Sequence, residues 1–418
     1  MRVLIAGGGV AGLEAALALR DLAGDRVSVM VLAPEDSFEV RALSVRDPFG
    51  APRAHRHALD AIAADAGFEL RRTTLASVEP ERHLALGADG GQFDYDALLV
   101  AIGARQVAAL PRTVTFTGPG SADEVAGVLQ DMEEGYARRI AFVAPAGATW
   151  PLPLYELALM TAERAASLGL DDVGITVVTP EHEPLELFGP EASAAVAELL
   201  RERGIVALTG TFVDPGAHAP ALGAGPGERR IAVDRVVSLP VLEGPAIPGL
   251  PADAAGFHPV DAQCRVSGVD DVWAAGDGTT FPVKQGGIAA QQADAAAYDI
   301  AARAGADVEP HPFRPVLRGV LLTGAGPRWM KHAVSGAGDP SVVAEHALWW
   351  PPSKVAGRYL APYLAEREEH PLETPPADAG VEVDVDLSAR PPGAPRSRRR
   401  AVLGDGPEGA LELLAYDE

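Results

Sequence analysis

Three glycines near the N-terminus constrain the fold of this chain more than any other feature. Gly7, Gly9 and Gly12 follow the G-x-G-x-x-G spacing, after a short apolar stretch that begins at Arg2 and before a stretch rich in Ala and Leu. A second apolar stretch follows at Val27 to Leu32. A strand, a glycine turn, a helix and a second strand in this order form the βαβ unit that binds dinucleotides.

Each glycine has a separate role in such a turn. Gly7 permits the tight turn, Gly9 lets the backbone approach a pyrophosphate, and Gly12 lets the helix pack closely on the strand. The helix that starts at Val10 and Ala11 presents free N–H groups and the positive end of its dipole to the phosphates. The alternative is an ordinary glycine-rich βα loop. The downstream motifs favour the dinucleotide site.

Composition limits the class of protein. A chain of 418 residues with 47% apolar residues is long enough for two or three domains. The net charge of −23 argues against nucleic acid and anionic membranes as partners. No apolar run is long enough to span a membrane, and the N-terminus enters the first strand without room for a signal peptide. We therefore expect a soluble, cytoplasmic protein. The histidines lack metal-ligand spacing, so no metal site is expected.

A second βαβ-like unit begins at Ile140. A helix is predicted from Leu154 to Ala166 and a strand from Ile175. The turn between the first strand and the helix keeps only Gly147 of the glycine pattern, and its Pro151 and Pro153 have no N–H to offer a phosphate. This half predicts a second nucleotide-type domain that has lost its fingerprint for a nicotinamide nucleotide.

A third module lies late in the chain. A strand ending in Val272-Trp-Ala-Ala leads into Gly276-Asp277-Gly278, and a helix is predicted from Ala289 to Ala302. This module would return the chain to the first domain. The predicted fold class is therefore α/β, with two Rossmann-like domains and a C-terminal cap. The expected boundaries are 1–110 with 253–305 for the first domain, 111–252 for the second, 306–370 for the cap, and 371–418 for a loosely ordered tail.

Together, these elements resemble the FAD-dependent pyridine nucleotide-disulfide oxidoreductases over residues 1–305. The resemblance rests on the glycine turn, on the strand from Tyr95 to Ala104 and on Trp273-Ala-Ala-Gly-Asp-Gly. Within that superfamily the chain looks most like the branch of sulfide:quinone oxidoreductases, flavocytochrome c sulfide dehydrogenases and type II NADH dehydrogenases. The residues that suggest this branch are Ser37-Phe-Glu-Val-Arg, Thr179-Pro-Glu-His-Glu-Pro, Phe188-Gly and Lys284-Gln-Gly-Gly.

The resemblance implies a non-covalent FAD. Its pyrophosphate would lie at the glycine turn, its adenine near the strand from Thr74 to Val78, and its ribityl chain beside Asp277. The N1/O2 edge of the flavin would face the helix N-terminus at Gln285 to Ile288, with Lys284 beside it; the alternative for Lys284 is a solvated surface lysine. The residues expected to contact FAD are Gly7, Gly9, Val10, Ala11, Gly12, Ala33, Glu35, Arg41, Val78, Ala101, Gly103, Gly276, Asp277, Lys284, Gln285 and Gly286.

The chain departs from the family pattern in two places. Relatives carry an acidic residue at the end of the second strand to hold the adenosine ribose, and here Ala33 stands there. Glu35 or Asp36 would replace it, or be a turn carboxylate in water. The chain also has one cysteine, Cys264, and no C-x-x-C. We therefore expect neither disulfide reduction nor cysteine-based sulfide oxidation, and interpret Cys264 as structural rather than catalytic.

The residues that would assist the flavin are few. Glu156 matches the place where relatives carry a glutamate that points toward the flavin, and is interpreted as a catalytic proton relay; the helix dipole alone would also favour a carboxylate there. Lys284, at the flavin edge, is the second residue expected to be catalytic. Trp150 either caps the flavin or packs between domains. The aromatic segment around Trp349 and Trp350 is interpreted as covering the flavin or as a homodimer contact, in preference to a membrane contact.

Three functions remain open from the sequence. The favoured one is an FAD-dependent oxidoreductase that passes a hydride or an electron pair between a small-molecule donor and an acceptor such as a quinone. The loss of the second glycine fingerprint argues against NAD(P)H as an ordinary donor. The alternatives are an NAD(P)H-dependent flavoprotein reductase with an atypical nucleotide loop, and a non-catalytic flavin-binding protein that senses redox state or serves a partner.

Overall fold

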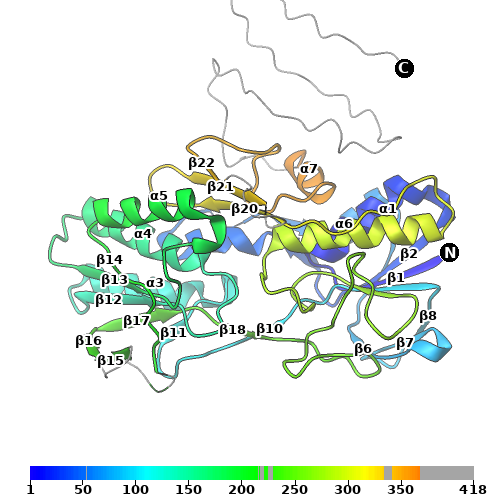
Figure 1. The fold of residues 1–418 in the computed structure, drawn as a ribbon, viewed down its shortest axis with the longest axis horizontal. Helices are drawn as coiled ribbons and strands as arrows, with labels where there is room; N and C mark the ends of the chain where they lie inside the picture. The colour runs from blue at the N-terminus through cyan, green and yellow to red at the C-terminus, as the bar shows by residue number, and fades with distance from the viewer. Residues whose placement is uncertain (53, 215, 217–220, 225–228, 334–340, 368–418) are drawn as a thin grey trace, which may run out of the picture.

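The computed structural model describes residues 1–52, 54–214, 216, 221–224, 229–333 and 341–367. Two parallel sheets lie at opposite ends of the molecule, and a small antiparallel sheet with a short helix lies above the space between them (Figure 1). The predicted α/β fold class with two Rossmann-like units is confirmed. The predicted tail, 371–418, lies outside the described residues, and the domain boundaries stay a prediction.

The first sheet has five parallel strands in the order β19-β9-β1-β2-β5. The strands are β1 (Arg2–Ala6), β2 (Ser28–Leu32), β5 (Glu69–Arg71), β9 (Ala97–Val100) and β19 (Val272–Ala274). The helices α1 (Val10–Ala23), α2 (Leu59–Ala66) and α6 (Gly286–Arg303) cover one face. The antiparallel strands β6 (Leu75–Glu79), β7 (Leu84–Gly87) and β8 (Gln92–Asp94) cover the other.

The alternation of side chains along β1 explains these two layers. Val3 and Ile5 lie in the core with the helices, whereas Leu4 and Ala6 lie in the core with the antiparallel strands. Successive strand residues point to opposite faces, so a strand buried on both faces needs a continuous apolar run. That is why this stretch reads as an uninterrupted apolar run in the sequence.

The second sheet repeats this plan with five parallel strands in the order β11-β17-β12-β13-β14. The strands are β11 (Val114–Thr115), β12 (Arg139–Val143), β13 (Gly174–Val178), β14 (Val206–Leu208) and β17 (Arg235–Ser238). Its helices are α3 (Ala122–Glu133), α4 (Leu152–Ser167) and α5 (Pro190–Glu202). The pair β15 (Ala221–Ala224) and β16 (Arg229–Ala232) follows β14 along the chain.

The remaining elements connect or cover the two halves. The cap consists of β20 (Val316–Leu321), β21 (Arg328–Ala333), β22 (Val342–Ala344) and α7 (Leu360–Ala365). The short strands are β3 (Ser37–Glu39), β4 (Arg56–Ala58), β10 (Arg105–Val107) and β18 (Val241–Glu243). The 3₁₀ helices are η1 (Gly24–Arg26), η2 (Arg41–Phe49), η3 (Pro80–Arg82), η4 (Pro119–Ser121) and η5 (Glu186–Phe188). Leu317 and Leu321 of β20 share a core with α4, while Leu360 and Leu364 of α7 share a core with α1 and α6.

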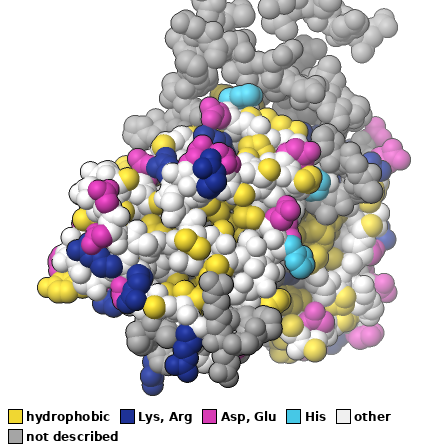
Figure 2. Space-filling model, turned by 60° about the vertical axis from the view of Figure 1, so that its left-hand side comes forward, with side chains coloured by type: hydrophobic (Ala, Val, Ile, Leu, Met, Phe, Trp, Pro, Cys, Tyr) yellow, Lys and Arg dark blue, Asp and Glu magenta, His cyan; other side chains and the backbone are white. Residues whose placement is uncertain are grey.

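Charged side chains of both signs are interspersed on the face shown in Figure 2. Ion pairs of the second sheet and its helices include Arg139 with Asp234 at 2.6 Å and Arg235 with Asp131 at 2.6 Å. Within the described ranges, no helix is long and apolar enough to cross a membrane.

Candidate functional site

In the glycine turn between β1 and α1, backbone atoms lie close to Gly7 and Gly12, whereas Gly9 faces open space. A Cβ atom on Gly7 would lie 2.2 Å from the Ala101 carbonyl oxygen, and one on Gly12 would lie 1.9 Å from the Gly7 carbonyl oxygen. Gly7 has a φ of 119°, which L side chains rarely adopt. A Cβ on Gly9, the N-cap residue of α1, would meet nothing within 4 Å. The turn therefore offers the first N–H groups of α1 to an open side, as a bound pyrophosphate requires.

The residue at the end of β2 is a buried alanine packed close to the glycine turn. Ala33 is fully buried, and a Cβ on Gly8 would lie 2.8 Å from the Ala33 Cβ. Glu35 is exposed, and the Arg72 guanidinium donates to its carbonyl oxygen. Arg72 also donates to Asp60 at 2.7 Å. The loop that carries Glu35 is thus held in place, while a contact of its carboxylate with a ribose stays a prediction.

The Gly276–Asp277 turn follows β19 and is fixed by α6. The Gly276 N–H donates to Oε1 of Gln292 at 2.8 Å, and the Thr279 hydroxyl donates to the Gly276 carbonyl oxygen at 3.0 Å. Nε2 of Gln292 donates to the Thr279 hydroxyl at 3.2 Å. Burial raises the pKa of Asp277, and the positive charges of Lys284 and Arg41 oppose that rise. Arg41 is therefore near this turn in space, although it is far away in the sequence.

Lys284 lies immediately before α6 and is buried, so the interpretation as a solvated lysine is wrong. It is 6% exposed, its ammonium lies 4.1 Å from the centre of the Phe257 ring, and it donates to the Thr279 carbonyl oxygen. Burial lowers its pKa to about 8, against the opposing effect of Asp277. The side chain of Gln285 caps α6 by accepting a hydrogen bond from the Gly287 N–H at 2.7 Å. A cation and a helix N-terminus therefore lie together beside Asp277.

The remaining predicted cofactor contacts differ in accessibility. The Val78 N–H donates to the Pro248 carbonyl oxygen at 2.9 Å, and its side chain is 3% exposed, which leaves little surface for an adenine. Ala101 and Gly103 follow β9, and the Ala101 N–H donates to the Ala6 carbonyl oxygen at 2.7 Å. Both positions lie at the carboxyl end of the sheet, where ligands of open α/β sheets bind.

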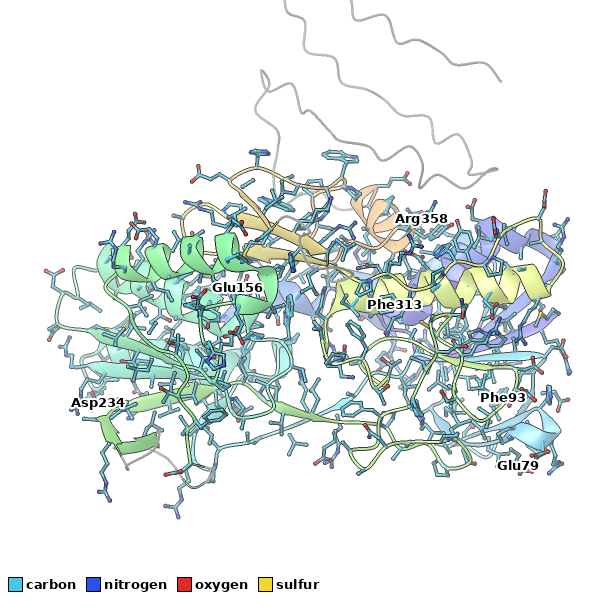
Figure 3. All side chains as sticks on the ribbon, in the orientation of Figure 1. Glu79, Phe93, Glu156, Asp234, Phe313 and Arg358 are labelled. Carbon is cyan, nitrogen blue, oxygen red and sulfur yellow. The ribbon has the colours of Figure 1, made fainter. Side chains whose placement is uncertain are left out.

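Glu156 is fully buried in α4, with both carboxylate oxygens engaged (Figure 3). One oxygen accepts from Nζ of Lys354 at 2.7 Å and the other from the Leu322 N–H at 2.9 Å. Lys354 also donates to the Ala42 carbonyl oxygen at 2.9 Å. Burial raises the pKa of Glu156, while the Lys354 charge opposes this. The carboxylate thus joins α4 to η2 and the cap, and its catalytic role stays a prediction.

Lys354 was not predicted as the partner of Glu156, because the two residues are 198 positions apart in the sequence. One signal was available in the composition. The chain has three lysines, and one of them, Lys354, follows the apolar, aromatic segment Leu348-Trp-Trp-Pro-Pro. A lysine beside such a segment is a candidate for a buried ion pair, because lysine is almost never fully buried unless it is paired.

The turn before α4 carries few hydrogen-bond donors. Helix α4 begins at Leu152, Pro151 is its N-cap residue, and the Leu154 N–H already donates to the Pro151 carbonyl oxygen at 2.9 Å. Pro153 has no N–H. The N-terminus of α4 is therefore a poorer place for a pyrophosphate than the N-terminus of α1.

A second carboxylate, Glu181, follows β13 in this half of the molecule. It accepts from the Tyr155 hydroxyl at 2.6 Å and from the Thr179 hydroxyl at 2.9 Å. Burial raises the pKa of Glu181 to about 7, and burial also raises the pKa of Tyr155. In dinucleotide-binding folds an acidic residue after the second strand holds a ribose. Glu181 belongs to the segment Thr179-Pro-Glu-His-Glu-Pro, but no role for its side chain was predicted from the sequence.

Two further predicted positions have packing roles in the structure. Trp150 meets Phe188 edge to face, with 5.6 Å between ring centres. Cys264 is fully buried, and burial raises the pKa of its thiol. A thiol with a raised pKa is a poor nucleophile, because the thiolate is the reactive form. Among the described residues, no group of three or more His, Cys, Asp and Glu side chains is placed to hold a metal ion.

A family model described as pyridine nucleotide-disulphide oxidoreductase matches residues 1–119 and 156–297. The chain therefore belongs to the pyridine nucleotide-disulphide oxidoreductase family, and the resemblance inferred from the motifs is confirmed. Proteins of this family are FAD-binding oxidoreductases, in agreement with the predicted cofactor. None of the curated protein sequences compared with the chain matches it.

Solved structures share the fold. The sulfide:quinone oxidoreductase from Aquifex aeolicus has a TM-score of 0.75 and 17% identity, over 82% of this chain and 87% of that one. The ferredoxin reductase from Rhodopseudomonas palustris has a TM-score of 0.61 and 21% identity, over 80% and 83%. NDH2 from Plasmodium falciparum, in complex with NADH, has a TM-score of 0.54 and 14% identity, over 66% and 64%. At these identities the likeness establishes the fold alone.

Proposed function

We propose that this member of the family passes a hydride or an electron pair, by way of non-covalent FAD, between a small-molecule donor and an acceptor such as a quinone. The observation that carries the proposal is the glycine turn, which is closed behind Gly7 and Gly12 and open in front of Gly9. The chain keeps this turn at the first sheet and lacks it at the second. The similar fold of a sulfide:quinone oxidoreductase supports a quinone as the acceptor class.

Bound FAD would supply the two-electron chemistry. The N–H groups at the start of α1 would hold its pyrophosphate, and Asp277 would accept a hydrogen bond from its ribityl chain. Lys284 and the N-terminus of α6 would face the edge of the flavin that gains negative charge on reduction. Lys284 is suited to this because its ammonium is already desolvated against Phe257.

The second half of the molecule favours a donor other than a nicotinamide nucleotide. Pro151 and Pro153 remove N–H donors from the start of α4, and the Leu154 N–H is already used. One observation supports the second candidate, an NAD(P)H-dependent reductase. Glu181 follows β13, where a ribose-binding carboxylate is expected, and NDH2, which has a similar fold, was solved with NADH.

The test is a spectrum of the purified protein followed by anaerobic additions. We expect the purified protein to show the absorption bands of oxidised flavin. Stoichiometric dithionite should remove these bands, and menadione added afterwards should restore them rapidly. We expect NADH and NADPH to bleach the flavin slowly or not at all. Rapid bleaching by NADH would favour the second candidate. Flavin that exchanges electrons with no donor or acceptor in a broad panel would favour a non-catalytic role, and protein that does not take up FAD would overturn the proposal.

A variant sharpens this test. Asp277→Ala removes the carboxylate proposed to hold the ribityl chain, so it should lower the FAD content of the purified protein severalfold. Asp123→Ala, at an exposed carboxylate of α3, is the matched control and should keep full FAD content.

A further inference from the structure

The segment that leads into α7 is bound to a buried carboxylate of α1. Glu14 is fully buried, and its two oxygens accept hydrogen bonds from the Tyr359 N–H at 2.8 Å and the Leu360 N–H at 2.7 Å. A Cβ on Gly357 would lie 2.4 Å from the nearer Glu14 oxygen, so glycine is what lets the chain approach this closely. Glu14 thus holds the first residues of α7 against α1.

A second buried carboxyl group faces the first from α6. Asp294 is 9% exposed, and its side chain forms a hydrogen bond with that of Glu14. Its Oδ1 atom is buried without a hydrogen-bond partner among the described residues. Ionised carboxylates only accept hydrogen bonds, so two carboxyl groups that bond to each other share a proton.

The proton belongs mainly to Asp294. Burial raises the pKa of Asp294 well above its usual value, and the adjacent Glu14 charge raises it further. Burial also raises the pKa of Glu14, but the backbone N–H groups of Tyr359, Leu360 and Arg358 oppose the rise. Glu14 therefore carries the negative charge, and the backbone N–H groups at the start of α7 stabilise this charge by donating hydrogen bonds to it.

Other ionisable groups surround the pair. Arg358 lies beside α7 and α6 in Figure 3, and its charge and that of Arg318 on β20 oppose the rise in the pKa of Asp294. Tyr298 of α6 contacts His311 at 4.4 Å between ring centres. Burial lowers the pKa of His311, so it is neutral above pH 7. The groups that interact with Asp294 are Tyr298 on α6, Arg318 on β20, Arg358 and Tyr359. Asp21 on α1 and His311 lie one step further out, where each interacts with Arg358.

We propose that Glu14 and Asp294 form a proton-dependent latch that holds the segment from Gly357 to Ala365 against α1 and α6. Loss of the shared proton leaves two buried negative charges face to face and releases the segment. The latch does not depend on the proposed flavin chemistry, although it is attached to the same two helices.

The sign of the pH dependence follows from proton binding. The closed segment keeps a proton on Asp294 that an exposed carboxyl group would release at neutral pH. The closed state is therefore favoured at low pH and is weakened as the pH rises toward the pKa of Asp294. Where one proton is released on opening, the opening equilibrium constant rises by up to about tenfold for each pH unit.

Hydrogen exchange measures this opening directly. In the purified protein as isolated, the protection of the Tyr359 and Leu360 amides is followed from pH 5 to pH 9, after correction for the intrinsic exchange rate. We expect protection to fall by up to about tenfold per pH unit below the raised pKa of Asp294 and to level off above it. Asp294→Asn keeps a donor to Glu14 and removes the proton, so its protection should stay high and independent of pH.

Two further variants separate the latch from general loosening. Asp65→Asn removes a surface carboxylate that accepts from the Tyr363 hydroxyl at 2.7 Å and from Arg367 at 2.9 Å, and it should lower protection without changing the pH slope. Tyr363→Phe should do the same, because it removes the hydroxyl that donates to Asp65 and leaves Glu14 and Asp294 in place. The proposal is wrong if the wild-type protein and Asp294→Asn show the same pH slope.

Discussion

Buried carboxyl groups in this chain differ in what compensates them. Glu156 is paired with the Lys354 ammonium at 2.7 Å. Glu14 accepts hydrogen bonds from backbone N–H groups and from the protonated carboxyl group of Asp294. The donors to Glu181 are neutral, namely the hydroxyls of Tyr155 and Thr179 and the Leu185 N–H. Neutral donors compensate a buried charge less fully than a cation does, so the protonation of Glu181 should affect stability near neutral pH.

Glu181 predicts a share of the pH dependence of stability. The pKa of Glu181 is about 7 in the folded protein, against an ordinary value of 4.5. Protonation of Glu181 therefore stabilises the folded state fully below about pH 4.5, and this stabilisation is lost as the pH rises through 7. The loss is about 3 kcal/mol in the free energy of unfolding. Urea unfolding at pH 5 and pH 8 should show a smaller difference in Glu181→Gln than in the wild type.

The matched control for Glu181 is Glu198→Gln, because Glu198 is an exposed carboxylate paired with Arg201 on α5. It should keep the wild-type difference between the two pH values. An unchanged pH dependence in Glu181→Gln would show that Glu181 is ionised throughout, and would contradict the prediction.

Single residues were predictable from the sequence where their role is local. The closeness of Gly12 to the Gly7 carbonyl depends on a turn of a few residues, and spacing alone reveals it. The burial of Lys284 against Phe257 and the pairing of Glu156 with Lys354 depend on segments that are far apart in the sequence. Periodicity and spacing carry no information on such contacts.

At the scale of elements, the start of α6 shows how a capping residue fixes the first turn of a helix. The sequence predicts the body of this helix from Ala289 to Ala302 and its N-terminus within Gln285 to Ile288. The structure starts α6 at Gly286, because the Gln285 side chain accepts from the Gly287 N–H and satisfies the first turn. The helix N-terminus therefore lies next to Lys284.

The turn into α1 predicts opposite effects of two similar substitutions. Gly12→Ala places a Cβ 1.9 Å from the Gly7 carbonyl oxygen, so it should destabilise the fold. Gly9→Ala meets no atom within 4 Å, so it should leave the melting temperature of the FAD-free protein within about 2 °C of the wild type. Gly9→Ala should instead weaken FAD binding at least tenfold, because its Cβ projects into the open side of the turn.

Thermal unfolding and FAD titration of the two variants check this contrast. Gly127→Ala in α3, where an added Cβ also meets nothing within 4 Å, is the control and should change neither quantity adversely. Full FAD affinity in Gly9→Ala would mean that the cofactor does not approach this turn.

At the scale of the whole molecule, the Lys354–Glu156 pair joins the cap to the second half. Lys354→Met leaves Glu156 buried without a cation, which should lower the free energy of unfolding by about 3 to 5 kcal/mol. The double variant Lys354→Met, Glu156→Gln removes both charges and should recover part of this loss. Urea unfolding measures the three proteins.

Lys331→Met is the control for this experiment, because Lys331 is an exposed lysine of β21. Its stability should stay within about 0.5 kcal/mol of the wild type. A double variant that is no more stable than Lys354→Met would contradict the assignment of the loss to an uncompensated charge.

The arrangement of two parallel sheets was predictable, because each βαβ unit is written in a continuous stretch of sequence. The position of the cap was not, because β20 and α7 find their partners on separate halves of the molecule. No sequence pattern shows which apolar surface β20 or α7 will pack against, because side-chain packing in the folded protein decides that choice.

The segment from Lys354 to Leu360 is bonded to α4 through Glu156 and to α1 through Glu14. Two-lobed proteins often admit ligands by swinging about a hinge. In this protein such a hinge motion would stretch the segment from Lys354 to Leu360, which is only a few residues long and is bonded at each end to a buried carboxylate. The two halves of the molecule can therefore swing apart only if one of these two attachments, at Glu156 or at Glu14, is broken first.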